Sequence, residues 1–214
     1  MTNQSLSQKI LLILSLCYSF NILAGDNTQL FRAIENNNRS AVTKYLEQGN
    51  SPNVLNRQGY TPLMMAIRNE NLPMVELFLE AGADAKIRNK YDETAIMLAS
   101  YHGQTEIVKK LYVHGAAIDH AGWNPLLYAA TNGHDETIAL LLTMGADVNA
   151  MADSGATALM MAVRGHHPKA VRLLLDEGAD PSAQNKAGDT ALDWALKRNH
   201  QALAKLLKQR SLQD

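Results

Sequence analysis

Hydrophobic positions recur along this chain as pairs of short helical stripes. The stretch from Gly122 to Ala150 shows the pattern most clearly. Two groups of apolar residues there have the spacing of one helical face: Leu126, Ala129 and Ala130, then Ile138, Leu141 and Leu142. The polar break Gly133-His134 separates the two stripes. This pattern predicts two short antiparallel helices followed by a projecting turn.

Particular residue types mark where these two helices begin and end. Asn124 has a side-chain oxygen that can accept from the free N–H groups of a helix start, and Pro125 follows where a missing N–H costs nothing. Gly145 comes directly after the second stripe, where a left-handed residue commonly ends a helix. The unit is therefore bounded by its own sequence at both ends.

The same unit occurs six times. The helix-start position is occupied, in steps of 33, 33, 30, 33 and 33 residues, by Thr28, Thr61, Thr94, Asn124, Thr157 and Thr190. The closing glycines keep the same steps: Gly49, Gly82, Gly115, Gly145 and Gly178. One such helix pair cannot bury its apolar face alone, so the repetition predicts a stack of repeats that share a continuous core.

Two short motifs give these repeats a family resemblance. The first is Thr61-Pro62-Leu63-Met64-Met65-Ala66, which returns as Thr157-Ala158-Leu159-Met160-Met161-Ala162, and the second is Gly-Ala-Asp at residues 82–84, 145–147 and 178–180. Over about residues 27 to 210 the chain resembles the ankyrin repeat, whose signature is T-P-L-H-x-A. The resemblance implies an all-α ankyrin-repeat solenoid of about six helix-turn-helix repeats with short β-hairpin-like loops.

The repeat pattern also predicts the organisation of the chain. We expect a repeat domain over residues 25–210 and a tail over residues 211–214, with repeats at about 27–55, 56–88, 89–120, 121–150, 151–183 and 184–210. The first and last repeats carry a polar face, as terminal repeats of a solenoid do. The step from Gly115 to Gly122 is three residues shorter than that from Gly145 to Gly155, which predicts one shortened loop beside Trp123. It is either functional or a neutral loop deletion.

The first residues have a different composition. Lys9 precedes the apolar run of residues 10–20, and the segment ends in the small residues Ala24 and Gly25. This order predicts a signal peptide over residues 1–24, cleaved after Ala24 or Gly25, with an uncleaved anchor as the alternative. The run is shorter than the ~20 residues of a spanning helix, so we expect no membrane insertion after cleavage. Cys17 is the only cysteine, and a mature chain without cysteine suits a bacterial periplasmic protein.

Charge and motifs exclude several functional classes. Lys and Arg number 20 against 21 Asp and Glu, which gives no basic field to favour nucleic acid. The sequence has no phosphate-binding glycine loop, His-Glu-x-x-His pair or serine elbow. We therefore expect a protein that is not an enzyme, with no catalytic residues and no cofactor. We also expect a monomer, because a capped solenoid has no obvious need to self-associate.

Histidine and methionine are the remaining candidates for chemistry. His102, His134 and His200 lie near corresponding inter-helix turns, which favours structural hydrogen bonds over metal binding. Met64, Met97 and Met160 share a repeat position with Phe31 and Leu127, which favours core packing. We expect no metal site, and metal or redox buffering by Met and His is an alternative that Cu(I) and Zn(II) uptake would test.

The resemblance implies where a partner would bind. In ankyrin-like proteins the contacting positions lie on the concave face, beside the loop glycine and at the end of the first helix. Here they are Arg57, Tyr60, Arg68, Asn69, Tyr91, Glu93, Tyr101, His102, Trp123, Asn132, Asp153 and Arg164, with Gln58, Lys90, Thr131, Ser154, Lys186, Asp189 and Lys197 beside them. Tyr, Trp and Arg are over-represented in interface hot spots, which favours a protein-binding surface. We expect Trp194 to pack within the last repeat.

These observations predict a protein that recognises another protein by shape and performs no reaction. The resemblance suggests an accessory role in the periplasm, in an envelope or oxidative-stress system. Two alternatives are an immunity protein that neutralises a toxic enzyme and a secreted effector that binds a host protein. Neighbouring genes would separate the first two roles, and the location of the mature chain would test the third.

Overall fold

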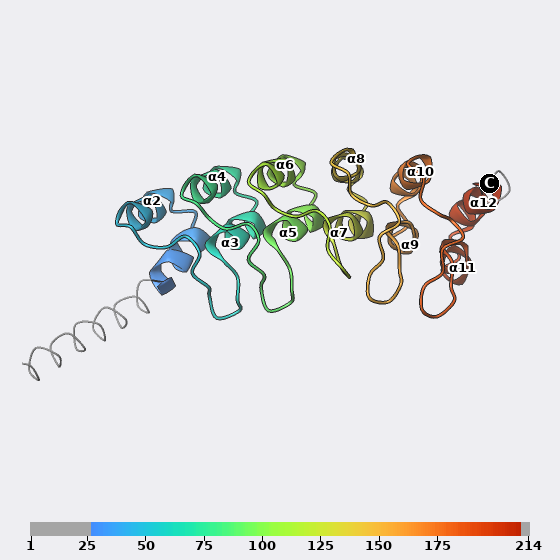
Figure 1. Cartoon of the computed structure of the whole chain (residues 1–214), viewed down its shortest axis with the longest axis horizontal. Helices are drawn as coiled ribbons and strands as arrows, with labels where there is room; N and C mark the ends of the chain where they lie inside the picture. Colours follow the sequence, from blue (N-terminus) through green and yellow to red (C-terminus); the bar gives the residue numbers. More distant parts are fainter. Residues whose placement is uncertain (1–26, 211–214) are drawn as a thin grey trace, which may run out of the picture. The chain divides into compact units, whose positions relative to one another are not determined.

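The computed structural model describes residues 27–210 (Figure 1). These residues are helical and contain no strand, although Met151 and Thr157 form an isolated antiparallel bridge. No helix within residues 27–210 is long and apolar enough to cross a bilayer. The predicted all-α ankyrin-repeat fold is confirmed, while the predicted signal peptide and the tail from residue 211 lie outside the described residues.

The chain divides into two compact units between Ala83 and Asp84. The described part of the first unit has a helix over residues 27–35, followed by α2 (Arg39–Glu47), α3 (Pro62–Arg68) and α4 (Leu72–Glu80). The second unit contains α5 (Ala95–Tyr101), α6 (Thr105–Val113), α7 (Pro125–Asn132), α8 (Asp135–Thr143), α9 (Ala158–Arg164), α10 (Pro168–Asp176), α11 (Ala191–Lys197) and α12 (Gln201–Arg210). The predicted extent of one repeat domain stays a prediction.

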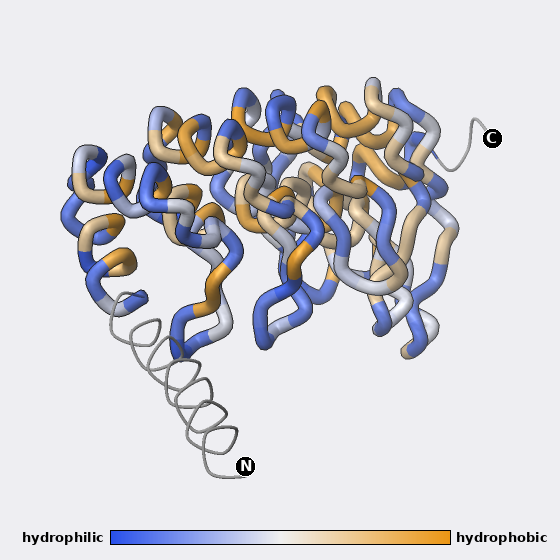
Figure 2. Tube along the Cα trace, turned by 60° about the vertical axis from the view of Figure 1, so that its left-hand side comes forward, coloured by the Kyte–Doolittle hydropathy of each residue, from blue (hydrophilic) through white to orange (hydrophobic). Residues whose placement is uncertain are grey.

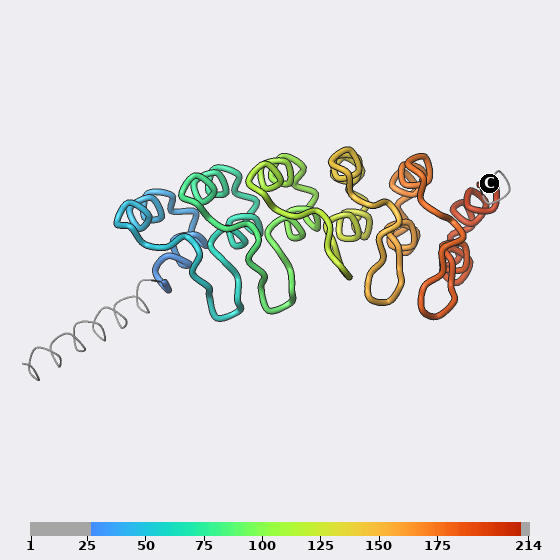
Figure 3. Tube along the Cα trace, in the orientation of Figure 1, coloured from blue at the N-terminus to red at the C-terminus, as the bar shows by residue number. Residues whose placement is uncertain are grey.

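The helices of the second unit form two stacked rows. The first helices of its repeats (α5, α7, α9 and α11) pack each on the next, and the second helices α6, α8 and α10 do the same. Each repeat closes by packing its own two helices together, as in α5 with α6 and α7 with α8. The loops that precede α7, α9 and α11 all project on one side of the first helices (Figure 3).

Small alanines allow this close packing of the first helices. Ala99, Ala129, Ala130, Ala162 and Ala195 are completely buried where successive first helices meet. Apolar segments follow the helices, whereas the ends of the projecting loops are hydrophilic (Figure 2). Each Å² of apolar surface that these stripes bury contributes about 25 cal/mol of favourable free energy, which provides the main driving force for folding.

The methionines belong to this core. Met97 and Met160 in the second unit are 2% and 1% exposed, and Met64 in the first unit is 1% exposed. Phe31 and Leu127, which stand at the same repeat position, are also buried. The core-packing interpretation of this position is therefore confirmed. Within residues 27–210 no three His, Cys, Asp or Glu side chains gather in a way that could hold a metal ion.

The predicted N-caps form at four of the six positions. The side chains of Thr61, Asn124, Thr157 and Thr190 each accept a hydrogen bond from the backbone N–H three residues later. Thr94 stands at the start of α5 but makes no such bond. The prediction for Thr28 is wrong, because the helix already includes residue 27 and Thr28 lies inside it. The hydroxyl of Tyr45 in α2 donates to Asn27 Oδ1 at 3.2 Å, which holds Asn27 against α2.

Histidines link successive repeats in the second unit. His134 donates through Nε2 to the carbonyl oxygen of Tyr101 at 2.9 Å, and His200 donates through Nδ1 to that of Val163 at 3.0 Å. This confirms the structural role predicted for both side chains. His102 follows the end of α5 and does not stand at the position that corresponds to His134 and His200. Counting back one repeat from His134 leads instead to Gln104, which stands directly before α6.

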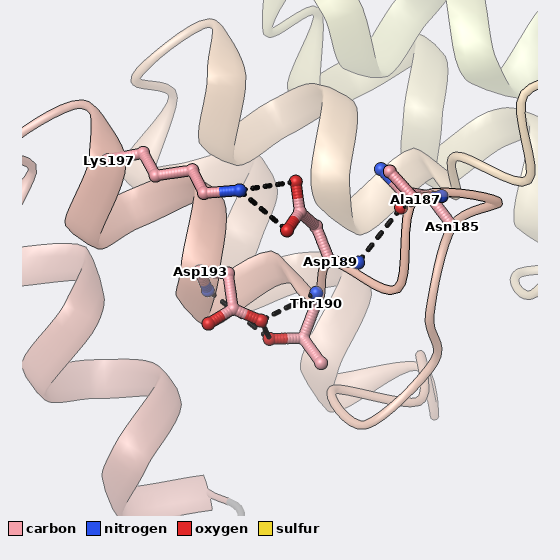
Figure 4. Close-up of polar contacts among 6 residues, drawn as sticks. All are labelled: Asn185, Ala187, Asp189, Thr190, Asp193 and Lys197. Atoms are coloured by element: carbon pink, nitrogen blue, oxygen red, sulfur yellow. Dashed lines mark hydrogen bonds and ion pairs between the residues drawn. The ribbon is translucent and has the colours of Figure 1, made fainter.

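An asparagine at the base of a loop organises the loop tip. Asn185 Oδ1 accepts from the N–H groups of Ala187 and Asp189, each at 2.9 Å (Figure 4). Asn89 does the same for the N–H groups of Tyr91 and Glu93. These bonds fix the backbone of the loop tip, and with it the positions from which the side chains at the tip project.

The loop between α6 and α7 is the short one, as predicted. Both flanking helices keep their full length, so the three missing residues come from the loop. Figure 1 shows that it projects less far than the loops before α9 and α11. It is closed by a bond between His120 Nδ1 and the carbonyl oxygen of Trp123 at 3.0 Å, in place of an asparagine.

Candidate functional site

Three aromatic side chains gather at the short loop and the first helices beside it. Tyr101 ends α5, Trp123 closes the short loop and Tyr128 lies in α7. The Trp123 and Tyr128 rings are 5.0 Å apart between centroids, and the Tyr101 and Tyr128 rings are 6.0 Å apart with an edge-to-face angle of 82°. Such geometry is favourable for aromatic pairs. We call Tyr101, Trp123 and Tyr128 the aromatic cluster.

Hydrogen bonds fix the centre of this cluster. The hydroxyl of Tyr128 donates to Glu93 Oε1 at 3.0 Å, while the side-chain amide of Asn89 donates to Glu93 Oε2 at 2.7 Å. One carboxylate thus connects the loop over residues 84–94 to helix α7. Because Glu93 is held by Asn89 and in turn restricts the Tyr128 ring, this ring loses little conformational entropy when a ligand covers it.

The cluster is accessible from solvent. Tyr101 is 45% exposed, and the rings of Trp123 and Tyr128 are each half-buried. Tyr91 projects from the loop tip and is 69% exposed. The other apolar side chains of α5 and α7 are buried, so Tyr101 and Tyr128 are the accessible apolar groups of those two first helices, and the other two rings lie in the loops before them.

Other predicted site residues of the second unit have roles in packing as well. The Asn132 side chain donates to the carbonyl oxygen of Tyr101 at 2.9 Å, and His102 makes an edge-to-face contact with the Tyr101 ring at 5.2 Å. Asp153 lies against Gly122 in the neighbouring loop, and Arg164 ends α9 with its side chain half-exposed.

Four predicted site residues lie in the first unit. The Arg68 guanidinium stands over the Tyr60 ring, 4.6 Å from its centroid, which is a cation–π contact. The Asn69 side chain donates to the carbonyl oxygen of Ile34 at 3.1 Å and therefore supports the stacking of the first two repeats. Arg57 is exposed near the tip of its loop.

The structure adds two aromatic residues that the sequence analysis did not place on this face. Tyr128 completes the aromatic cluster, and Trp194, which we expected to pack within its repeat, is half-buried and partly accessible. Both occupy the repeat position at which Leu98 and Met161 are buried. An aromatic residue at an otherwise aliphatic position was the available signal. Trp194 stays accessible because no first helix follows α11 within the described residues.

Comparison with known proteins identifies the class. A family model described as ankyrin repeats in three copies matches residues 8–90, 30–121, 71–152 and 144–213. These matches cover most of the chain, which therefore belongs to the ankyrin-repeat family. Ankyrin repeats are protein-interaction modules and are generally non-catalytic.

One curated relative shares a single segment with this chain. Over 56 residues the chain is 41% identical to protein phosphatase 1 regulatory subunit 27 of Homo sapiens. The segment covers 25% of this chain and 36% of the relative, so the chain spans about a third of the relative's length. The relative's name describes a regulatory subunit of a phosphatase.

Proposed function

We propose that this chain is a non-enzymatic protein-binding module whose partner covers the aromatic cluster and Tyr91. The observation that carries the proposal is the exposure of these rings on the face formed by the loops and first helices. Four aromatic side chains there are half-buried or exposed, in a unit whose core leaves few large apolar side chains accessible.

Their chemistry suits recognition of a protein. Tyrosine and tryptophan combine a large apolar surface with a polar group, and they are enriched among residues that contribute most to protein–protein binding. Glu93, which is itself held by Asn89, already holds Tyr128 in place, so recognition uses a preformed surface. No bond needs to be made or broken for such a function.

Family membership and the curated relative support the proposal. Ankyrin repeats act through binding, and a regulatory subunit is by name a protein that acts on another protein.

The proposal places this interaction in the bacterial periplasm, as an accessory to an envelope or stress system. The apolar run of residues 10–20 supports export, and the absence of cysteine after Cys17 suits an oxidising compartment. The immunity and effector roles use the same binding face and differ in the partner.

A capture experiment tests the proposal. The tagged full chain is incubated with bacterial envelope extract beside two double variants, Tyr101→Ala with Trp123→Ala, and Tyr112→Ala with Val113→Ala. Tyr112 and Val113 are 40% and 75% exposed on the second helix α6, so the second variant removes two exposed apolar side chains away from the proposed site.

We expect the first variant to lose a partner that the wild type and the α6 variant retain. Helical circular dichroism has to be equal for all three proteins. Equal capture by the two variants would show that the partner does not use the aromatic cluster.

A further inference from the structure

Two repeats pair the residue at the end of the loop with a cation at the end of the following first helix. In the first unit, Arg68 at the end of α3 is covered by Tyr60, eight positions earlier. In the second unit, Lys197 at the end of α11 bonds both carboxylate oxygens of Asp189, at 2.6 and 2.7 Å (Figure 4). In each case the loop residue contacts the cationic side chain at the end of the first helix in its own repeat.

Arg164 is a third cation at this repeat position, and it has no such partner. It ends α9, and the residue at the corresponding loop position is Ala156, whose methyl group is buried and cannot accept a hydrogen bond. The Arg164 guanidinium forms no hydrogen bond or ion pair with any side chain or carbonyl in residues 27–210. Its five N–H donors are therefore left for a group that comes from outside the chain.

Arg164 lines a hollow that is also lined by a second arginine without a side-chain partner in residues 27–210, Arg198. The hollow has a volume of about 520 Å³ and is lined by Arg164, Trp194, Lys197 and Arg198. Like Arg164, the exposed Arg198 has no side-chain partner among the described residues. We call these four residues the basic hollow. Since Lys197 is neutralised by Asp189, the two guanidinium groups give the hollow its excess positive charge.

This combination of groups selects carboxylates. A guanidinium matches a carboxylate with two parallel hydrogen bonds, and the half-buried Trp194 indole offers an apolar surface beside them. We propose that the basic hollow binds an acidic segment of the partner protein, with carboxylates on Arg164 and Arg198 and an apolar side chain against Trp194. This inference rests on the proposed function and specifies the chemistry of the partner.

The charges favour a peptide over a nucleic acid. Nucleic-acid binding depends on contacts with many successive phosphates, whereas this hollow offers two unpaired cations. The whole chain has a formal net charge of −1, so no broad positive field surrounds them. Two arginines are sufficient to pair with the carboxylates of a short run of Asp or Glu.

Peptide binding to the full chain tests the inference. The probes are two fluorescein-labelled pools of random peptides, one rich in Asp and Glu and the other with Asn and Gln at the same positions. Binding is followed by fluorescence anisotropy. It is also followed by Trp194 emission. The sequence has two tryptophans, so this measurement uses a Trp123→Phe background in which Trp194 is the remaining one.

Two charge-matched double variants localise the binding. Arg164→Gln with Arg198→Gln changes the basic hollow, and Lys169→Gln with Arg172→Gln removes two exposed cations from the second helix α10 of the same repeat. We expect the acidic pool to bind, the amide pool to bind much less, and the hollow variant to lose about tenfold or more in affinity. The α10 variant should bind as the wild type does, and added salt should weaken binding.

Several results would overturn the inference. They are equal losses in the two variants, equal binding of the two pools, binding of neither pool, or tighter binding of a DNA oligonucleotide than of the acidic pool. The proposed function is judged separately, because it depends on partner capture through Tyr101 and Trp123. A partner captured through the aromatic cluster together with no acidic-peptide binding would refute only the inference about the basic hollow.

Discussion

One residue in each inter-helix turn determines how closely two repeats can approach. This position has a positive φ angle in every repeat and is occupied by Asn37, Glu70, Gly103, Gly133, His166 and Asn199. Where it is glycine, the missing side chain leaves room for a ring of the next repeat. A β-carbon added to Gly133 would lie 2.4 Å from the His167 ring, and His167 donates through Nε2 to the Thr131 carbonyl.

The Gly133→Ala substitution is therefore expected to destabilise the second unit. The left-handed backbone alone costs an alanine about 1–2 kcal/mol, and the overlap with His167 adds to that cost. Gly145→Ala is the control, because Gly145 also has a positive φ but has no atom within 4 Å of the added carbon. Urea denaturation should give a lower midpoint for Gly133→Ala than for Gly145→Ala, and equal midpoints would contradict the packing account.

Two threonines at equivalent helix starts provide a second residue-level test. Thr157 caps α9 by accepting from the Met160 N–H at 3.3 Å, whereas the buried Thr94 hydroxyl has no partner among the described residues. We expect Thr157→Ala to lower the free energy of unfolding by about 1 kcal/mol and Thr94→Ala to lower it by less. The measurement is chemical denaturation of both variants, and a larger loss from Thr94→Ala would refute the cap assignment.

At the level of elements, sequence and structure agree where the determinants are local. Apolar spacing and capping residues predict the helices because both act within one or two turns. The length of the short loop also follows from counting residues. The contact between Tyr128 and Glu93 does not follow from local pattern, because it joins residues in different repeats and depends on how those repeats stack. The accessibility of Trp194 likewise depends on which helices surround it.

The start of α11 has a capping box that makes its stability depend on pH. The hydroxyl and the N–H of Thr190 donate to Asp193 Oδ2 at 2.6 and 2.9 Å (Figure 4). These bonds, led by that of the hydroxyl and aided by the charge of Lys197, hold the pKa of Asp193 below its usual value of 3.8. A lowered folded-state pKa means that the stabilisation is complete above the unfolded-state value and is lost as pH falls through the folded-state pKa.

Acid denaturation of Asp193→Asn tests this element. Wild-type protein should lose stability progressively below about pH 5, and the variant should lose less over the same range because its amide does not titrate. Asp180 provides a comparison, since bonds from the hydroxyl and N–H of Ser182 also lower its pKa. Removing both carboxylates should flatten the pH profile further, and an unchanged profile would contradict the assignment.

For the whole molecule, the predicted export has a direct test. Cell fractionation and N-terminal sequencing should find the chain in the periplasm, beginning at Gly25 or Asp26, because a short apolar run followed by small residues is typical of a cleaved signal. An uncleaved chain in the membrane fraction would support the anchor alternative. Intact protein in the cytoplasm would exclude export.

The central claim is that a partner protein binds the face formed by the loops and first helices of the second unit. A photo-crosslinking amino acid placed at Tyr91, in the loop before α5, tests this most directly. The same group at Tyr112 on α6 is the control, because both tyrosines are exposed. The account predicts a crosslinked partner from the Tyr91 position and none from Tyr112. Crosslinking from Tyr112 alone would place the partner on the second helices and contradict the account.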